Sequence, residues 1–286
     1  MASGKSQTIF IIVGIAVGVA VQIFLGSLIN SLQDSLVDET IGNSSHITIR
    51  NIEDTVSLAI SQTSGEDLVF RGNQPLFQKN LDNWALLVEE IAKEESVTAI
   101  SPTLQGTALV KSSGRDRSVQ IKGVVLEDAD RIYDISSRMV LGLPVAEGNT
   151  ILIGATLAQD LSLTEGDSLN VLLPNGSSVR LIIGGIYDLQ NEAANGSLLF
   201  MDLRRAQKLF NTGDTVSSIE TQITDPFEAD VIASQWKQSL GNVKVEEWME
   251  LNQQLLSALS SQSSSSYTIQ FFVILSITLG IASVLA

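Results

Sequence analysis

The sequence has no cysteine, one histidine and few aromatic residues. Among its 286 residues the only histidine is His46, and aromatic residues make up 5%. The absence of cysteine excludes disulfides, thiolate catalysis and cysteine metal sites. A single histidine cannot provide a metal site with several histidine ligands. Because His46 stands at the start of a predicted strand, we expect it to have a structural role.

Basic residues are also scarce. Lysine and arginine total 17 against 32 aspartate and glutamate residues, which gives a formal net charge of −15. A nucleic-acid partner is not expected, because it would require a basic face. The acidic stretch Leu126–Arg131 lacks the glycine and terminal glutamate of a calcium loop, so we interpret it as a solvated turn. Since no nucleophile can be paired with a base, we expect no enzyme activity, cofactor or metal site.

Charged residues are absent from a long stretch near the N-terminus. Thr8–Ile29 contains no charged side chain, and about 20 apolar residues suffice to span a bilayer. The apolar core of a signal peptide usually has only about 7–15 residues, so we predict a transmembrane helix over 8–29. Leu28, Leu32 and Leu36 continue the helical spacing beyond the membrane. This pattern predicts a stalk helix over 30–42.

A second uncharged stretch occupies the other end of the sequence. Residues 267–286 are largely apolar up to the last residue, which predicts a second transmembrane helix that the sequence truncates. Apolar residues at helical spacing precede it and predict a second stalk over 248–266. The apolar residues of this stalk are Trp248, Leu251, Leu255 and Leu259. A serine-rich run within the stalk fits either a flexible linker or a polar helix at the membrane surface.

Small residues recur four positions apart within both predicted membrane helices. This spacing lets helices approach closely, and an amide side chain in the membrane favours a hydrogen-bonding partner. We therefore expect these positions to contact other membrane helices or a second subunit, although glycine is also simply common in such helices. The positions are Gly14, Gly18, Gln22 and Gly26 in the first helix and Ser276 and Gly280 in the second.

The orientation in the membrane is predicted from the few charges beside the first helix. Lys5 precedes this helix, and Asp34 and Asp38 follow it. Positive residues favour the cytoplasmic side of a membrane. We therefore predict that residues 1–7 are cytoplasmic, that the chain crosses the cell membrane twice, and that residues 43–247 are extracytoplasmic.

The middle region, 43–247, has the pattern of an α+β domain. The β-branched run His46–Ile52 is typical of a strand, and Asn83–Lys93 has the apolar spacing of a helix. Two turn signals, of which Pro174–Gly176 is the stronger, predict hairpins. We therefore predict two subdomains, one of them a hairpin-rich insertion over about 105–215.

Further elements are predicted along the same region. Runs rich in β-branched residues indicate strands, and apolar residues three and four positions apart indicate helices. The predicted strands are Val97–Ile100, Gly106–Lys111, Ser118–Val125, Thr150–Ile153, Ser168–Leu173, Ser178–Ile183, Leu198–Met201, Ile219–Ile223 and Val243–Glu246. The predicted helices are Ala155–Leu161, Leu203–Phe210 and one from Asp225 to about Leu240, with a proline in its first turn.

The order of these parts resembles one family of membrane proteins. The motifs that carry the resemblance are VTAISPTLQG at 97–106, the pattern G..LA..L.L..GD within 147–167, GIYD at 185–188, LLFMDLRRAQKLF at 198–210, DPFEA at 225–229 and EEWMELNQQLLSAL at 246–259. Together they resemble the permease subunits of ABC transporters of the MacB, LolC and FtsX type, especially the lipoprotein-releasing LolC/LolE branch. The basic segment that this family has before its first span is reduced here to Lys5.

The resemblance implies a mechanical function. In this family a separate cytoplasmic ATPase closes on ATP, the spans shift, and the stalks carry the motion to the outer domain. The implied partners are that ATPase, a second permease copy or paralogue, membrane lipid, and an exported substrate such as a lipoprotein. Two other functions fit the same order of parts, namely an FtsX-like regulator of cell-wall hydrolases and a two-span receptor that binds a ligand. The family has four spans, so the resemblance implies the first half of a permease.

Overall fold

The structure is a computed structural model that describes residues 44–52, 80–112 and 115–254, with single residues and short runs near both ends. The chain forms two compact units, Gly42–Trp248 and a second unit made of Met1–Ile41 and Met249–Ala286. Within the described parts, no helix is both long enough and apolar enough to cross a membrane. We call the unit Gly42–Trp248 the globular domain, and every strand that the structure describes lies in it.

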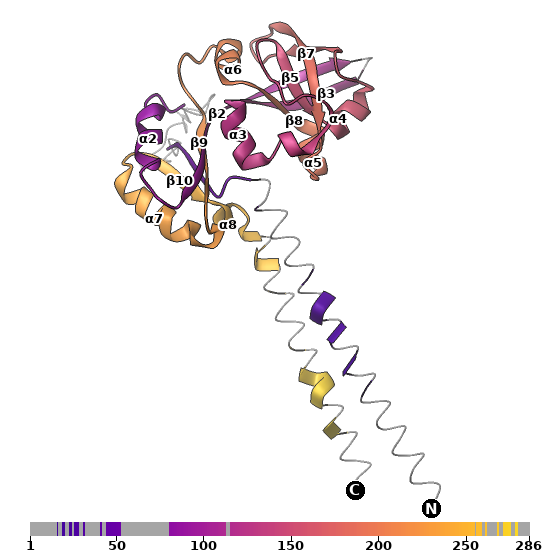
Figure 1. Ribbon diagram of the computed structural model, residues 1–286, viewed down its shortest axis with the longest axis vertical. Coiled ribbons are helices and arrows are strands. Elements are labelled where there is room, and N and C mark those ends of the chain that lie inside the picture. Colours follow the sequence, from indigo (N-terminus) through magenta and orange to yellow (C-terminus); the bar gives the residue numbers. More distant parts are fainter. Residues whose placement is uncertain are drawn as a thin grey trace, which may run out of the picture. The chain divides into compact units, whose positions relative to one another are not determined.

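One part of the globular domain is a four-stranded antiparallel sheet in the order β10-β1-β9-β2 (Figure 1). Helix α2 (Trp84–Ile91) contacts β2, and helix α7 (Ala229–Ser239) contacts β10. The helix predicted from Asp225 to about Leu240 forms as the short turn η2 (Pro226–Glu228), which Asp225 caps, followed by α7. The strands are β1 (Ile47–Asn51), β2 (Val97–Ser112), β9 (Ser218–Ile223) and β10 (Val243–Glu247).

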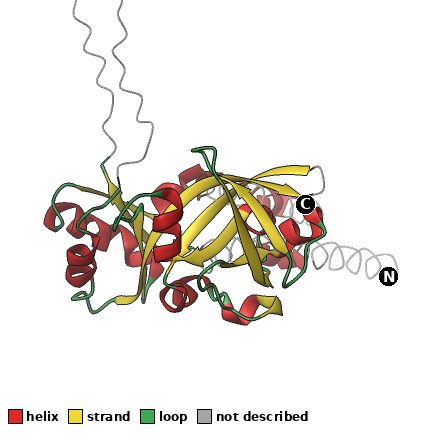
Figure 2. Ribbon diagram, turned by 90° about the horizontal axis from the view of Figure 1, so that it is seen from above, coloured by secondary structure: helices red, strands yellow, loops and turns green. Residues whose placement is uncertain are grey.

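The other part is a closed ring of six strands. The pairing runs from β2 to β3, β8, β5, β7 and β6, and β6 pairs again with β2. These strands curve strongly in Figure 2, as closure of a ring requires. The remaining ring strands are β3 (Arg115–Val124), β5 (Thr150–Gly154), β6 (Ser168–Leu172), β7 (Ser178–Tyr187) and β8 (Leu198–Asp202), and β4 (Met139–Gly142) pairs with β7 outside the ring.

The inside of the ring is apolar because alternate residues of each strand point inward. Residues paired across the strands share a face, so the inward set follows from the register of each pair. The buried apolar members of this set are Val110, Val119, Ile121, Ile151, Ile153, Leu169, Val171, Leu181, Ile183, Leu199 and Met201. The α+β class and the two hairpins, β2–β3 and β6–β7, are therefore confirmed.

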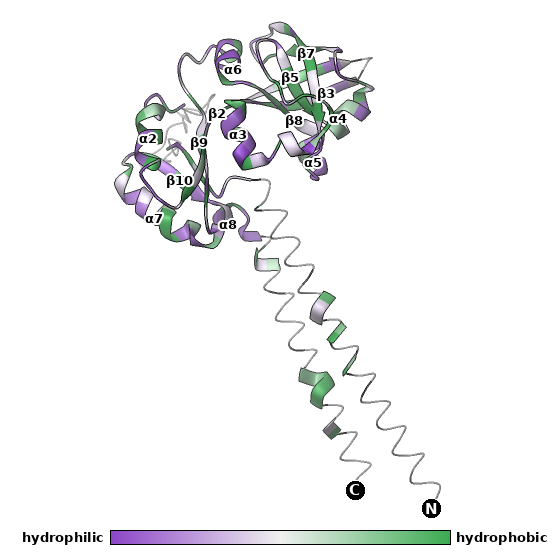
Figure 3. Ribbon diagram, in the orientation of Figure 1, coloured by the Kyte–Doolittle hydropathy of each residue, from purple (hydrophilic) through white to green (hydrophobic). Residues whose placement is uncertain are grey.

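Short helices connect the strands of the ring. Helices α4 (Ala155–Leu161) and α6 (Leu203–Phe210) have the bounds that their sequences predict. Helix α3 (Leu126–Tyr133), which is largely hydrophilic in Figure 3, turns its apolar face to a cluster that includes Phe200 and Tyr187. The remaining short elements are η1 (Ser136–Arg138), α5 (Glu192–Ser197) and α8 (Trp248–Leu251).

The predicted solvated turn at 126–131 is wrong, since this stretch forms most of α3. Glu127 and Asp128 lie in its first turn, where the positive end of the helix dipole favours negative charge. Ala129 and Ile132 are buried at a spacing of three residues. The acidic residues alone indicated a turn, whereas the apolar spacing between them indicates a helix.

The two strands predicted at 97–100 and 106–111 are one long strand, β2. Pro102 lies within it, although proline cannot donate a backbone hydrogen bond. Ser217 N donates to Thr103 O, so the polar groups of Thr103 face β9 and those of Pro102 face the other side. Pairing with β3 begins only at Thr103, so the missing donor leaves no ladder bond unmade. Because of this, β2 runs continuously from the four-stranded sheet into the ring.

Helix α6 lies close to the sheet because two glycines make room for it. A β-carbon at Gly106 would overlap the ring of Phe210, and one at Gly123 would overlap the β-carbon of Ala206. Gly106 and Gly123 lie on the face of β2 and β3 that continues into the inside of the ring. The absence of side chains at these two positions therefore sets the distance at which α6 packs.

Replacing Gly106 with alanine should destabilise the globular domain. The added methyl group would overlap the Phe210 ring and displace α6, and overpacking of this kind typically costs about 1–3 kcal/mol. Urea unfolding followed by tryptophan fluorescence measures the change. Gly196→Ala is the matched control, because its methyl group would meet its nearest neighbour, on Thr156, at 3.7 Å within helix α5. Equal losses in the two variants would contradict this account.

Candidate functional site

Both ends of the globular domain come together at one point. Strands β1 and β10 are antiparallel neighbours, with Ile47 opposite Glu247. Just beyond this pair, Trp248 N donates a hydrogen bond of 2.9 Å to His46 O. The chain therefore enters and leaves the domain side by side, and we call His46, Trp248 and their contacts the exit junction.

Trp248 anchors the exit junction to the domain. Its side chain is 1% exposed, and its indole Nε1 donates to the backbone oxygen of Pro226 at 2.7 Å. The ring also meets Phe227 edge to face, with 5.8 Å between centroids. A large aromatic side chain held by both contacts resists displacement. A pull on the chain after Trp248 would therefore act on β10 and η2 together.

His46 forms the other half of the exit junction. The imidazole is buried, and its Nδ1 accepts a hydrogen bond from Ile223 N at 3.1 Å. Burial lowers the pKa of His46 from its ordinary value, because the charged form is poorly solvated there. A nitrogen that accepts a hydrogen bond carries no proton, so the bond to Ile223 requires this nitrogen of the ring to be unprotonated. This structural role is the one that the sequence indicates.

A buried polar network lies close to the exit junction. Thr48, two residues after His46, stands opposite Glu220 of β9. Glu220 is buried and pairs with Lys122 of β3 at 2.9 Å. Tyr133 of α3 accepts a hydrogen bond from Lys122 and donates one to Glu220. Burial and the charge of Glu220 raise the pKa of Tyr133 well above its usual value, which keeps it a donor.

This network joins the two parts of the globular domain. Glu220 belongs to the four-stranded sheet, whereas Lys122 belongs to the ring. Thr103 and Gln105 of β2 also donate to the Glu220 carboxylate, at 3.3 and 3.4 Å. A buried ion pair keeps its geometry only when its remaining hydrogen-bonding groups are satisfied, as they are here. The network therefore provides a stiff connection from the exit junction to the ring.

The sequence contains only a weak signal for this network. Lys122 and Glu220 are single charged residues inside two predicted strands, Ser118–Val125 and Ile219–Ile223. A charged residue in a strand is usually placed on the solvent side. Lys122 and Glu220 meet and are buried because β3 and β9 pair with the two sides of β2, and periodicity does not reveal this pairing of distant strands.

The described parts of the chain contain clefts but no metal-binding cluster. No group of three or more histidine, aspartate or glutamate side chains in these parts could hold a metal ion. A cleft of about 710 Å³ lies between β2, the end of α6 and Pro174. Its lining is uncharged and consists mainly of amide and hydroxyl side chains. Such a lining suits binding through hydrogen bonds and offers no nucleophile–base pair.

The predicted stalk and membrane residues are only partly described. Gly26 and Leu28 are helical, and Leu28 is exposed. Leu251 ends α8 and is exposed, whereas Trp248 begins α8 and is buried within the globular domain. The other predicted positions lie outside the described residues, namely Gly14, Gly18, Gln22, Leu32, Leu36, Leu255, Leu259, Ser276 and Gly280.

The fold and the exit junction define a domain whose two chain connections lie side by side. Comparison with known proteins gives the family of this domain. Residues 8–239 match the MacB-like periplasmic core domain family. The chain therefore belongs to this family, and its motifs correctly predicted a likeness to ABC transporter permeases of the MacB, LolC and FtsX type. This family is a component of transporters rather than a class of enzymes.

One curated relative is the lipoprotein-releasing system transmembrane protein LolC of Neisseria meningitidis serogroup B. It is 20% identical over 220 residues, which cover 70% of this chain and 51% of LolC. The chain thus spans about half the length of this relative.

Two solved structures are similar to this chain. The periplasmic region of MacB from Actinobacillus actinomycetemcomitans is 10% identical and covers 76% of this chain and 95% of its own, with a TM-score of 0.49. The extracellular domain of the ABC-type transporter YknZ from Gram-positive bacteria is 10% identical and covers 56% of this chain and 87% of its own, with a TM-score of 0.41. Membership of the family rests on the match over residues 8–239.

Replacing Lys122 with methionine should strongly destabilise the domain. Glu220 would remain buried without its cation, and breaking a buried pair in this way costs about 3–5 kcal/mol. Urea unfolding measures the loss. Lys122→Met combined with Glu220→Gln should recover much of it, because no unpaired charge remains. Lys93→Met, which breaks an exposed pair with Glu90, should change the free energy of unfolding by no more than about 1 kcal/mol. Similar losses for Lys122→Met and Lys93→Met would refute the proposed stiff connection.

The exit junction should weaken in mild acid. Because the folded-state pKa of His46 is lowered, the unfolded chain takes up the proton first as the pH falls. The stabilisation that neutral His46 contributes is therefore complete above the ordinary pKa of 6.5. It is lost as the pH falls toward the lowered pKa that His46 has in the folded domain. His46→Asn keeps an acceptor oxygen near Ile223 N but cannot be protonated. The free energy of unfolding is measured against pH for the wild type and for His46→Asn. The difference in favour of the wild type should shrink as the pH falls from about 7.5 to 5.5. A constant difference over this range would exclude a contribution from His46.

Proposed function

We propose that this chain is the permease subunit of an ABC transporter, and that it transmits motion from a cytoplasmic ATPase to the globular domain. The observation that carries the proposal is the exit junction, where both connections of the domain meet at one hydrogen-bonded point. A displacement of either flanking helix would reach β1 or β10 directly. From there the buried network around Glu220 would pass it to the ring. Membership of the permease family supports the same conclusion.

The proposed arrangement in the membrane follows the sequence. Residues 8–29 and 267–286 cross the cell membrane, and 30–42 and 248–266 form the stalks. Residues 1–7 then lie in the cytoplasm, and the globular domain lies on the other side of the membrane. The small-residue positions, from Gly14 to Gly26 and at Ser276 and Gly280, would contact neighbouring helices of the same permease or of a second copy.

We further propose that the cargo is a lipoprotein. The support is the similarity to LolC, which is a transmembrane protein of a lipoprotein-releasing system. The partners in this proposal are an ATPase subunit, a second permease copy or paralogue, and membrane lipid. No cofactor is needed on this chain, because a moving helix transmits displacement mechanically and ATP is hydrolysed by the partner.

Reconstitution tests the proposed function. The protein at its natural length is placed in proteoliposomes with the ATPase that is encoded beside it, and ATP hydrolysis is measured with and without purified lipoproteins. Stimulation by lipoproteins is the expected result, because a coupled transporter responds to its cargo. Failure to associate with any ATPase would overturn the proposal and would favour a receptor. Association with the ATPase without stimulation by lipoproteins would support the permease function and reject lipoproteins as the cargo.

Trp248→Ala should separate hydrolysis from transport. Without its anchor on Pro226 and Phe227, the chain could move after β10 without moving the domain. Lipoprotein released per ATP hydrolysed should fall about tenfold, which corresponds to roughly 1.4 kcal/mol of coupling, while basal hydrolysis stays unchanged. Trp236→Ala is the matched control, since it also removes a buried tryptophan, from helix α7 on β10, but leaves the bond from Trp248 to Pro226 in place. An equal fall in both variants would mean that lost stability explains the effect.

A further inference from the structure

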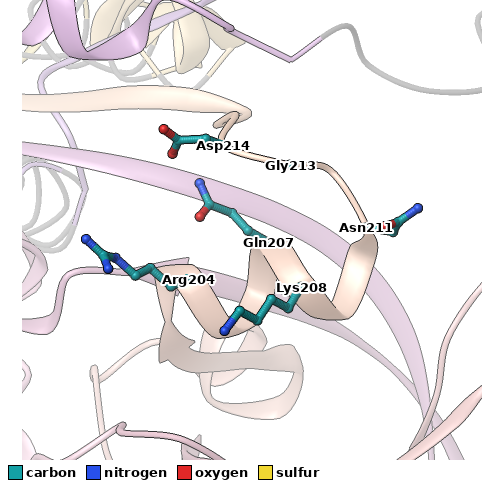
Figure 4. Close-up of a pocket in the computed structure, with 6 residues that line it drawn as sticks. All are labelled: Arg204, Gln207, Lys208, Asn211, Gly213 and Asp214. Carbon is teal, nitrogen blue, oxygen red and sulfur yellow. The ribbon is translucent and has the colours of Figure 1, made fainter.

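Helix α6 carries an unusual concentration of positive charge. Arg204, Arg205 and Lys208 lie within one eight-residue helix, whereas the whole sequence has a net charge of −15. Arg204 and Lys208 are exposed and stand four residues apart, so they share one side of the helix. Figure 4 shows both side chains extending from α6 beside a cavity. We call Arg204 and Lys208 the α6 basic pair.

These charges have no ionic partner in the part of the chain that the structure describes. Other basic residues do pair with carboxylates there, including Arg50, Lys111, Arg117, Arg131 and Arg138. Arg204 and Lys208 form no such pair, and the buried Nε of Arg205 has no hydrogen-bond partner. Among the described residues, therefore, no carboxylate forms an ion pair with the charges of α6.

Helix stability does not explain the two arginines. Arg204 and Arg205 lie in the first turn of α6, which contains no acidic residue. The positive end of the helix dipole disfavours cations there by a few tenths of a kcal/mol or about 1 kcal/mol each. Lys208 lies in the last turn, where a cation is favourable. Arg204 therefore stands where folding alone favours an acidic residue.

The surroundings of the basic pair provide space for a ligand. A cavity of about 460 Å³ is lined by Arg204, Gln207, Lys208, Asn211, Gly213 and Asp214. Asn211 also lines the larger uncharged cleft of about 710 Å³, so the two spaces are neighbours at the end of α6. In the larger cleft, Gln120 donates to Gln105 and Gln105 donates to Glu220, and the remaining donor and acceptor positions of the two amides can bond a peptide backbone.

We propose that α6 and the adjoining cleft bind an extended acidic segment of a partner protein. Its carboxylates would pair with Arg204 and Lys208, and its backbone would continue into the amide-lined cleft. Arginine is suited to this role because its planar group holds a carboxylate through two hydrogen bonds. Charge complementarity selects an acidic segment, since this is an uncompensated positive face on an acidic domain. The proposal goes beyond the permease function and does not require ATP hydrolysis.

Asp214 distinguishes an acidic ligand from a cationic one. Its carboxylate lies across the cavity from the α6 basic pair in Figure 4. An acidic ligand would be repelled by Asp214 and a cationic ligand would be attracted. Asp214→Asn should therefore tighten the binding of an acidic peptide. Weaker binding in this variant would show that the site prefers cations and would overturn the proposal.

A direct binding measurement tests the site. The full chain, held in an uncharged detergent, is titrated against a fluorescein-labelled peptide of about eight alternating glycine and glutamate residues, roughly 26 Å long when extended. Fluorescence polarisation should show binding that weakens at high salt. Arg204→Gln combined with Lys208→Gln should raise the Kd about tenfold, as expected for two partly exposed charge-assisted contacts. The same peptide with glutamine in place of glutamate should not bind.

The matched control removes the same charge elsewhere. Lys111→Gln combined with Arg117→Gln also lowers the net charge by two, at exposed positions of the β2–β3 hairpin. This control should bind the acidic peptide as the wild type does. Equal weakening in both double variants would mean that net charge alone attracts the peptide, and would refute a site on α6. Absence of any binding by the wild type would refute it as well.

Anionic lipid is the main competing ligand for a basic face. Flotation of the full chain with vesicles that contain phosphatidylglycerol distinguishes it from a protein segment. We expect the α6 double variant to float as the wild type does. A loss of flotation with unchanged peptide binding would assign the basic pair to a membrane surface and overturn the proposal.

Discussion

The buried ion pair between Lys122 and Glu220 is the interaction on which the architecture depends. It connects the ring to the four-stranded sheet, and Tyr133 brings α3 to the same point. Such a pair contributes little net stability compared with apolar residues, but it tolerates only one arrangement of its partners. It therefore explains how two parts of one sheet, which share only the long strand β2, can keep a fixed geometry.

The buried ion pair also lies close to the exit junction. Glu220 stands opposite Thr48, which is two residues after His46, and the backbone oxygen of His46 accepts a hydrogen bond from Trp248 N. A few residues therefore separate the point of chain entry from the centre of the domain. In the proposed permease function, this short path would carry motion from the flanking segments to the ring.

Helix α6 shows how packing and recognition can be separated on one short element. Its inner side fits against Gly106 and Gly123 through Phe210 and Ala206. Its outer side presents Arg204 and Lys208 at the edge of a cavity that neighbours a larger cleft. Because the inner side fixes the helix on the sheet, the outer charges keep their place although no described carboxylate pairs with them. Binding at such a surface requires less ordering than binding at a loop.

The sequence by itself determined the local elements, because hydrophobic periodicity and turn residues act over short distances. It predicted α4 and α6 with their observed bounds, the β6–β7 hairpin and the family. Tertiary structure decided what depends on distant strands meeting, namely the parallel pairs β3–β8 and β5–β7, the burial of Lys122 with Glu220, and the meeting of His46 with Trp248. Strand β2 also continues through Pro102 only because its pairing with β3 begins at Thr103, after the residue that lacks a backbone donor. These contacts join residues far apart in the chain, and no local pattern encodes their register.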